Sequence, residues 1–264
     1  MSYLQRLFSG FSASAQSVGQ FQRMLDWKLL RGSHEFPGPD GGTCVNEAAL
    51  VAAGYPYRAV YSVQDLPASF SRPIAMLALC LNDTVEDEQR QKLLLPFVTR
   101  LAGSADNETV EMERARLILE STIRDILIPA LVQEKHADLS HLNRLRNALS
   151  STAELARALH SLSHSFLPRT LTSACEHACN AMAQLECRRP TEAVFCVFLA
   201  MRELAGWEAD GAIYERAAGI LKQVLEIGKQ ANEEPESMIV KRMREARRRP
   251  VPRRRAGRTL QLIS

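Results

Sequence analysis

Apolar residues recur every three or four positions along most of this chain, which is the spacing of one face of an α-helix. Residues 18–31, for example, carry Phe21, Met24 and Leu25 at this spacing. Segments with this pattern, bounded by capping residues or by Gly and Pro, predict helices at residues 18–31, 43–53, 71–81, 83–101, 108–133, 138–166, 170–188, 191–206, 210–230 and 235–248. Only residues 55–61 suggest an extended segment, and Pro56 keeps them out of a central strand. The pattern predicts an all-α fold, an irregular multi-helix bundle of about eight to ten helices.

Composition agrees with a helical protein in a reducing compartment. The 264 residues are 46% hydrophobic but only 6% aromatic, and the apolar residues are mostly Leu and Ala, which favour helices over sheets. No apolar run approaches the roughly 18 residues that a membrane helix needs, and the first residues have no signal-peptide pattern. The six cysteines are scattered through apolar helical stretches, where a thiol packs as a small hydrophobe. We therefore expect a cytoplasmic protein with no disulfide framework, no membrane span and no cofactor.

Charge divides the chain into an acidic body and a basic C-terminal segment. The net charge is +3, yet residues 241–258 hold ten basic residues and one Glu, so the remainder carries about −6. We expect a helical domain over residues 1–240, with a sub-boundary near residue 137, and a basic, disordered tail over residues 241–264.

The basic tail is expected to bind an anionic partner, either a nucleic acid or an acidic protein surface. It contains no aromatic residue for base stacking, so any nucleic-acid binding should be independent of base sequence. The arginines expected to make these contacts are Arg247, Arg248, Arg249, Arg253, Arg254 and Arg255. The alternative is a solvated segment that serves only solubility.

The segment of residues 32–43 is the one place where residues suited to a specific loop replace residues suited to a helix. Its four glycines and two prolines forbid a regular element. Thr43 is the expected N-cap of the helix that follows, and Cys44 then occupies the first helical position, where the helix dipole favours a thiolate. Backbone N–H groups of Gly41, Gly42 and Thr43 are candidates for an anion-binding nest.

Two interpretations of this loop remain open. In the first, Cys44 is a nucleophile, His34 is its base, and Asp40 or Glu35 orients the histidine. In the second, the loop is an ordered plug on the helical body. There Cys44 is a buried small residue, and Asn46 and Glu47 tie down the loop backbone.

A metal site is conceivable where two helices meet near Pro168. His160 and His164 are four residues apart, as are Cys175 and Cys179, so each pair shares a helix face. Pairs at this spacing also arise easily by chance, and the surrounding positions are apolar. Buried thiols and interface histidines explain the pattern, so we expect no metal.

One part of the sequence resembles a known family. Residues 27–49, WKLLRGSHEFPGPDGGTCVNEAA, are similar to the N-terminal motif of a family of uncharacterised bacterial proteins. The resemblance continues through residues 70–74, 81–83 and 95–102 and is weaker over residues 214–228, whereas residues 151–196 and the basic tail depart from it. The resemblance implies an all-helical fold and implies no activity.

Taken together, these features predict a non-enzymatic α-helical binding protein. Its specific surface would be the loop of residues 32–43, and its tail would hold an anionic partner, most simply a protein. One alternative is a small cysteine-dependent enzyme using Cys44, His34 and Asp40. The other is a nucleic-acid-associated protein that acts through the tail without sequence preference.

Overall fold

The structure, a computed structural model, describes residues 27–35, 42–134, 139–148, 152–164, 167–206, 212–231 and 235–248. Its elements in chain order are β1 (Lys28–Leu29), β2 (Gly42–Thr43), α3 (Val45–Ala52), η1 (Val63–Asp65), α4 (Arg72–Thr84), α5 (Asp87–Leu94), η2 (Leu95–Phe97), α6 (Glu108–Thr122), η3 (Ile123–Leu127), α7 (Ile128–Gln133), α8 (Leu139–Ala148), α9 (Thr152–Ser163), α10 (Arg169–Glu186), α11 (Pro190–Ala205), α12 (Ala212–Leu225) and α13 (Glu236–Arg248). The all-α prediction is confirmed.

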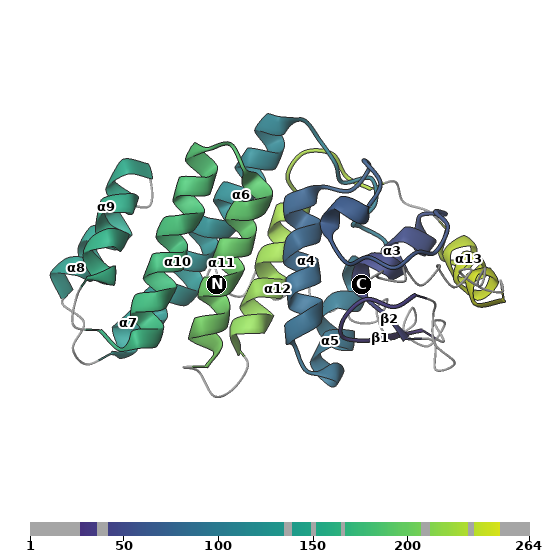
Figure 1. Ribbon diagram of the computed structural model, residues 1–264, viewed down its shortest axis with the longest axis horizontal. Helices are drawn as coiled ribbons and strands as arrows, with labels where there is room; N and C mark the ends of the chain where they lie inside the picture. The colour runs from purple at the N-terminus through teal and green to yellow at the C-terminus, as the bar shows by residue number, and fades with distance from the viewer. Residues whose placement is uncertain are drawn as a thin grey trace, which may run out of the picture.

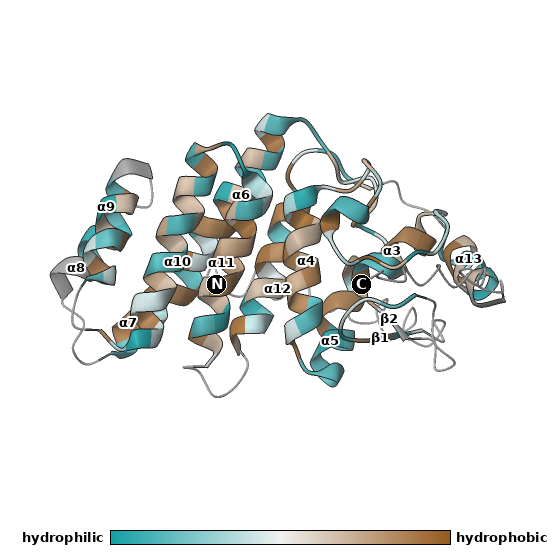
Figure 2. Cartoon of the chain, viewed as in Figure 1, coloured by the Kyte–Doolittle hydropathy of each residue, from teal (hydrophilic) through white to brown (hydrophobic). Residues whose placement is uncertain are grey.

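The long helices lie side by side in the middle of the molecule (Figure 1). Helix α11 packs against α10, α6 and α4, and α12 packs against α4 and α6. Helices α7, α8 and α9 lie at one end, and β1, β2, α3 and α13 lie at the other. Each central helix carries both hydrophobic and hydrophilic residues (Figure 2), as expected for amphipathic helices around a shared core. Leu77, Ile118 and Leu204 are fully buried in that core.

The prediction of a helix over residues 18–31 is wrong from Trp27 onward, and residues 18–26 lie outside the described residues. Residues 28–29 instead form β1, which pairs in parallel with β2 in the register Lys28 to Gly42. Side chains distant in sequence bond this backbone: Leu29 N donates to Gln91 Oε1 at 2.9 Å, and Asn82 Nδ2 donates to Leu30 O at 2.9 Å. These tertiary hydrogen bonds outweigh the local helical spacing.

Several helix boundaries also differ from the sequence prediction. Helix α4 runs on to Thr84, past the start expected at residue 83 for the next helix, and α5 begins at Asp87. The single helix expected over residues 138–166 is two helices, α8 and α9. Just before Pro129 the chain makes one π-helical stretch, η3, which accommodates a residue that has no N–H to donate.

Helix α13 begins at Glu236, so the domain boundary expected at residue 240 falls inside it. Its side chains Ile239, Val240 and Met243 are buried, and the helix packs against α3. The guanidinium Nη1 of Arg242 donates to the backbone oxygen of Ala52 at 2.8 Å. The later part of the basic segment lies outside the described residues, including Arg249, Arg253, Arg254 and Arg255.

A search of the described residues finds no helix long and apolar enough to cross a membrane.

Candidate functional site

Helix α3 begins one residue later than the sequence predicts. Cys44, not Thr43, is its N-cap, while Thr43 belongs to β2. The Cys44 sulfur accepts the backbone N–H of Glu47 at 3.4 Å, and Glu47 Oε2 accepts the backbone N–H of Cys44 at 2.9 Å. This reciprocal pair is a capping box with a thiol where Ser or Thr is usual.

Glu47 is the centre of a larger buried network, which we call the Glu47 hub. Its side chain is fully buried and accepts hydrogen bonds from donors on three separate segments. Among the described residues the donors are Ser33 Oγ (2.7 Å), His34 N (2.8 Å) and Val60 N (3.1 Å) on Oε1, and Thr43 Oγ1 (3.1 Å), Cys44 N (2.9 Å) and Tyr57 OH (3.2 Å) on Oε2. An ionised carboxylate accepts and never donates, so it matches a shell made only of donors.

The hub ties the loop to the body of the protein. It joins the residues that follow β1, the start of α3 and the extended segment that follows α3. His34 Nδ1 also lies 3.4 Å from Glu47 Oε2, without hydrogen-bond geometry, and becomes an ion-pair partner whenever the imidazole is protonated. The hub therefore orders residues 33–34 and 43–47 against residues 57–60.

The electrostatics of the hub keep the Cys44 thiol neutral. Burial is the main cause that raises the pKa of Cys44 well above its ordinary value, and the charge of Glu47 raises this pKa further. The same two causes, burial first, raise the pKa of the Tyr57 hydroxyl. A helix N-terminus alone favours a thiolate, but here desolvation and a neighbouring carboxylate outweigh it.

Of the residues of the cysteine-enzyme hypothesis, the structure describes Cys44, His34 and Glu35. Cys44 has no exposed surface, and its sulfur accepts a hydrogen bond from the backbone N–H of Glu47. His34 Nδ1 faces the Glu47 carboxylate, and Glu35 is exposed. Asp40 lies outside the described residues.

Two of the three residues expected to form an anion-binding nest belong instead to a strand. Gly42 and Thr43 are buried and form β2, where Leu30 N donates to Thr43 O at 2.8 Å. Gly41 lies outside the described residues.

Of the four candidate metal ligands, His160 lies on α9, His164 directly follows that helix, and Cys175 and Cys179 lie on the neighbouring α10. The rings of His160 and His164 contact each other edge to face, with centroids 4.5 Å apart. Cys175 is buried, which raises the pKa of its thiol to about 12, and Cys179 is half-buried. Within the described part of the chain, no group of three or more His, Cys, Asp or Glu side chains is arranged to hold a metal ion.

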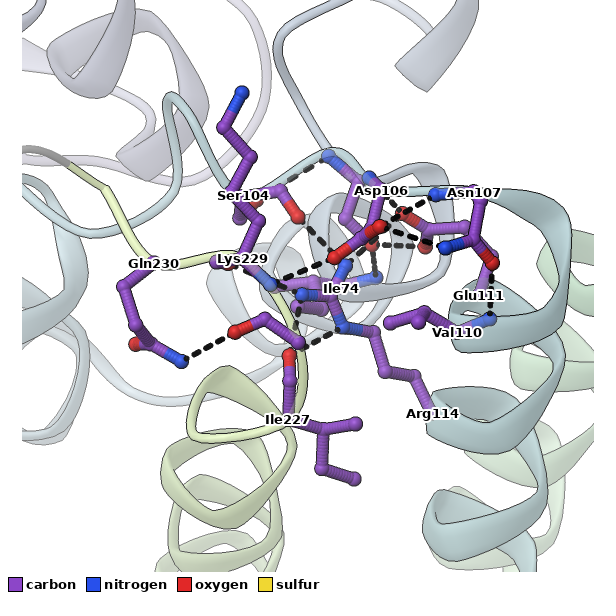
Figure 3. A network of polar contacts seen from close by, with 12 residues as sticks. Ile74, Ser104, Asp106, Asn107, Val110, Glu111, Arg114, Ile227, Lys229 and Gln230 are labelled. Atoms are coloured by element: carbon purple, nitrogen blue, oxygen red, sulfur yellow. Dashed lines mark hydrogen bonds and ion pairs between the residues drawn. The ribbon is translucent and has the colours of Figure 1, made fainter.

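A second buried network, which we call the Arg114 clamp, was not predicted from the sequence (Figure 3). Arg114 on α6 is fully buried and donates to the backbone oxygens of Ser104, Ile227 and Lys229 and to Glu111 Oε1, over distances from 2.5 to 3.3 Å. Asp106 Oδ2 accepts the backbone N–H of Lys229 at 2.7 Å. The clamp thus joins the end of α12 to the start of α6.

Both networks left a trace in the sequence. Arg114 lies one helical turn before the apolar Ile118, so a long cation falls on the buried face of its helix. Glu47 lies three residues after Cys44, the capping-box spacing, but the cap residue is an unusual Cys. The identity of the partners of either residue was not visible from this spacing.

The molecule also has a groove of about 600 Å³ at the opposite end from α13, between η3, α7 and α8. It is lined by Arg124, Ile128, Pro129, Val132, Gln133 and Arg146. The described residues of its lining present a mostly apolar surface.

No protein-family model, curated protein or solved structure matches this chain. Any function assigned to it therefore rests on the geometry of the described residues.

Proposed function

We propose that this chain is a non-enzymatic α-helical binding protein. The loop of residues 32–43 forms its specific surface, and the basic segment of residues 241–258 holds an anionic partner. The observation that carries the proposal is the docking of α13 on α3. Helix α3 begins at the Glu47 hub, which orders the two ends of the loop, and it carries the basic helix at its C-terminal end.

The side of α13 that faces away from α3 supports this assignment. Lys241 and Arg244 are exposed, and neither forms an ion pair with a residue that the structure describes. Arg242 instead points inward to Ala52 O. Cations that are held on a folded element and left without carboxylate partners are available to an external anion.

The buried Cys44 weighs against the cysteine-dependent enzyme. A nucleophilic thiol needs access to substrate and a thiolate within reach of a base. Cys44 is enclosed and its pKa is raised, so the capping and packing roles account for it.

The test is the binding of the full chain to two fluorescent polyanions, a 20-residue poly-glutamate and a 20-nucleotide oligothymidylate. Fluorescence anisotropy is measured at increasing salt. The double variant Lys241→Ala/Arg244→Ala removes two exposed cations of α13. A matched control, Arg146→Ala/Arg169→Ala, removes the same charge from exposed positions on α8 and α10.

We expect binding to at least one polyanion, with an affinity that falls steeply as salt rises. The α13 variant should bind more weakly, while the control should bind like the natural chain. Absence of binding to both polyanions, or equal losses in the two variants, would contradict the proposal.

A further inference from the structure

We infer that the anionic partner is a single-stranded nucleic acid, which binds along the exposed tyrosines of residues 55–61, the first of which adjoins the basic helix α13. This inference rests on the proposed function and names the partner of that same site. The basic segment has no aromatic residue of its own. The aromatic side chains come instead from residues 55–61, which follow α3 along the chain.

The junction of the two segments is a close contact. Gly54 has φ of +85°, and the space that a Cβ would occupy there lies 3.3 Å from the Arg242 guanidinium carbon. Tyr55 is the next residue, and its backbone N–H donates to Leu50 O at 2.9 Å. Helix α13 and Tyr55, the first residue of the tyrosine segment, are therefore neighbours at the C-terminal end of α3.

Tyr55 is a partly exposed ring held in a fixed position. Its hydroxyl bonds Ser69 Oγ at 2.9 Å, and its ring lies against Phe70 with centroids 6.4 Å apart. The side chain still exposes 37% of its surface. A ring that is already immobilised loses little conformational entropy when a base stacks on it.

Tyr61, at the other end of this segment, is the most exposed large hydrophobic residue among those the structure describes, at 69%. Its backbone is fixed because Tyr61 N and Ser62 N both donate to Asp65 Oδ2, at 3.0 and 2.8 Å. An aromatic ring that projects into water from an anchored backbone is a suitable stacking platform.

Cations flank both tyrosines. Arg58 lies between them in sequence and is exposed. Arg72 lies nearby, bonded to the backbone oxygens of Leu66 and Pro67 at 2.8 and 3.3 Å. Burial, and then the charge of Arg58, lower the pKa of Arg72, whereas the charge of Glu111 raises it. The exposed Arg58 is the cation of this segment that is open to a phosphate.

An acidic protein and a nucleic acid make different demands on such a surface. A carboxylate-rich partner needs only the cations, and it gains nothing specific from exposed rings. Single-stranded nucleic acid uses both, because its phosphates contact cations while its unpaired bases stack on aromatic side chains. A duplex keeps its bases stacked within itself and leaves the tyrosines unused.

The experiment compares Tyr61→Ala with Tyr61→Phe in the full chain. The probes are the labelled oligothymidylate, a 20-base-pair duplex and the poly-glutamate. Tyr61 is so exposed that its loss leaves the fold intact, which circular dichroism and the unfolding midpoint would verify. Tyr61→Phe keeps the ring and is the matched control.

We expect Tyr61→Ala to weaken oligothymidylate binding by about 5- to 100-fold and to leave its salt dependence unchanged. Tyr61→Phe should bind normally, and poly-glutamate binding should be the same in both variants. Lys241→Ala/Arg244→Ala should instead lower the logarithmic salt slope for oligothymidylate by about 1.4, or about 0.7 for each phosphate that the protein no longer neutralises.

The outcomes separate this inference from the proposed function. Salt-dependent binding of the polyanions with no effect of Tyr61→Ala on oligothymidylate would overturn the nucleic-acid inference and leave the binding protein standing. Tighter binding to poly-glutamate or to the duplex than to oligothymidylate would do the same. Failure of all three probes to bind would overturn both proposals.

Discussion

The Glu47 hub and the Arg114 clamp are two solutions to the same problem, the satisfaction of buried backbone groups far from water. The hub uses a carboxylate that collects N–H and O–H donors, and the clamp uses a guanidinium that collects carbonyl oxygens. Each central side chain is fully buried. The clamp also contains a carboxylate of opposite charge, Glu111, whereas among the described residues the charge opposite Glu47 is that of His34 when it is protonated.

The two networks differ most in how far along the chain they reach. The partners of Glu47 lie within 14 residues of it, whereas Arg114 bonds Ile227 and Lys229, which are 113 and 115 residues away. The hub is therefore a local network that orders the ends of the loop, and the clamp is a long-range network that joins the end of α12 to α6. We expect damage to the hub to remove the loop surface, and damage to the clamp to loosen α12 from α6.

The largest effect should come from Glu47. Replacement by Ala removes this acceptor from the backbone N–H groups of His34, Cys44 and Val60 and from the Ser33 hydroxyl, and it should lower the free energy of unfolding by about 3–5 kcal/mol. Glu47→Gln is the sharper test, because it keeps the shape but places an NH2 group opposite three donors. We expect the Gln variant to lose nearly as much, measured by urea unfolding. Glu113→Gln, at an exposed position of α6, is the control and should change little.

If Glu47→Gln were as stable as the natural chain, charge and acceptor capacity would not hold the hub together. The contrast between a carboxylate-centred hub and a guanidinium-centred clamp would then not hold for the hub.

Arg114 should come next. Arg114→Met keeps an apolar stem of similar length but removes the donor to Ile227 O and Ser104 O and the ion-pair partner of Glu111, and it should cost about 3 kcal/mol in urea unfolding. Arg116→Met, on the exposed face of the same helix, is the control. Hydrogen exchange should show faster exchange in α12 for the Arg114 variant alone. An equal response in both variants would show that the clamp does not hold α12.

The contrast also explains which parts of this molecule could be predicted from sequence. The spacing of apolar residues predicts most of the helices, because the buried face of a helix is marked by apolar residues within that helix itself. The strand at Lys28 was missed because its hydrogen-bond partners, such as Gln91, lie 62 residues further along the chain. The N-cap of α3 was predicted one residue too early, because the choice between Thr43 and Cys44 depends on which backbone N–H the Glu47 side chain accepts. The chemistry of Cys44 could not be predicted either, because burial decides it and sequence position does not.

Gly228 tests the far side of the clamp with a smaller change. Its φ is +68°, and a Cβ there would lie 2.5 Å from Val110 Cγ1 and 2.6 Å from Asp106 Oδ2. Gly228→Ala should therefore cost about 2 kcal/mol from backbone strain and overpacking together. Gly219→Ala is a matched control within α12, because nothing lies within 4 Å of the added atom. It should stabilise the protein by up to about 1 kcal/mol, since Ala favours a helix over Gly. Thermal unfolding would measure the change in stability of each variant. A Gly228→Ala variant as stable as the natural chain would show that the turn adjusts to the added methyl group without loss of stability.

The smallest expected effect on stability is that of Cys44→Ser, below about 1 kcal/mol, because the hydroxyl can accept the same Glu47 N–H. The natural thiol should be unreactive to a small alkylating agent at about pH 8 until the protein unfolds, whereas the exposed Cys187 should react in the folded protein.

The pH dependence has a defined sign. The pKa of Cys44 is raised in the folded state, so the unfolded thiol ionises near its ordinary value of 9.0 while the folded one stays neutral. The stability that the neutral thiol contributes is complete below that value and declines as pH rises above it. Cys44→Ala should flatten this decline. A Cys44 that is alkylated in the folded protein, at a rate that falls when His34 is replaced by Ala, would reverse the assignment and make the hub an active-site candidate, because only a thiolate assisted by a nearby base would behave in that way.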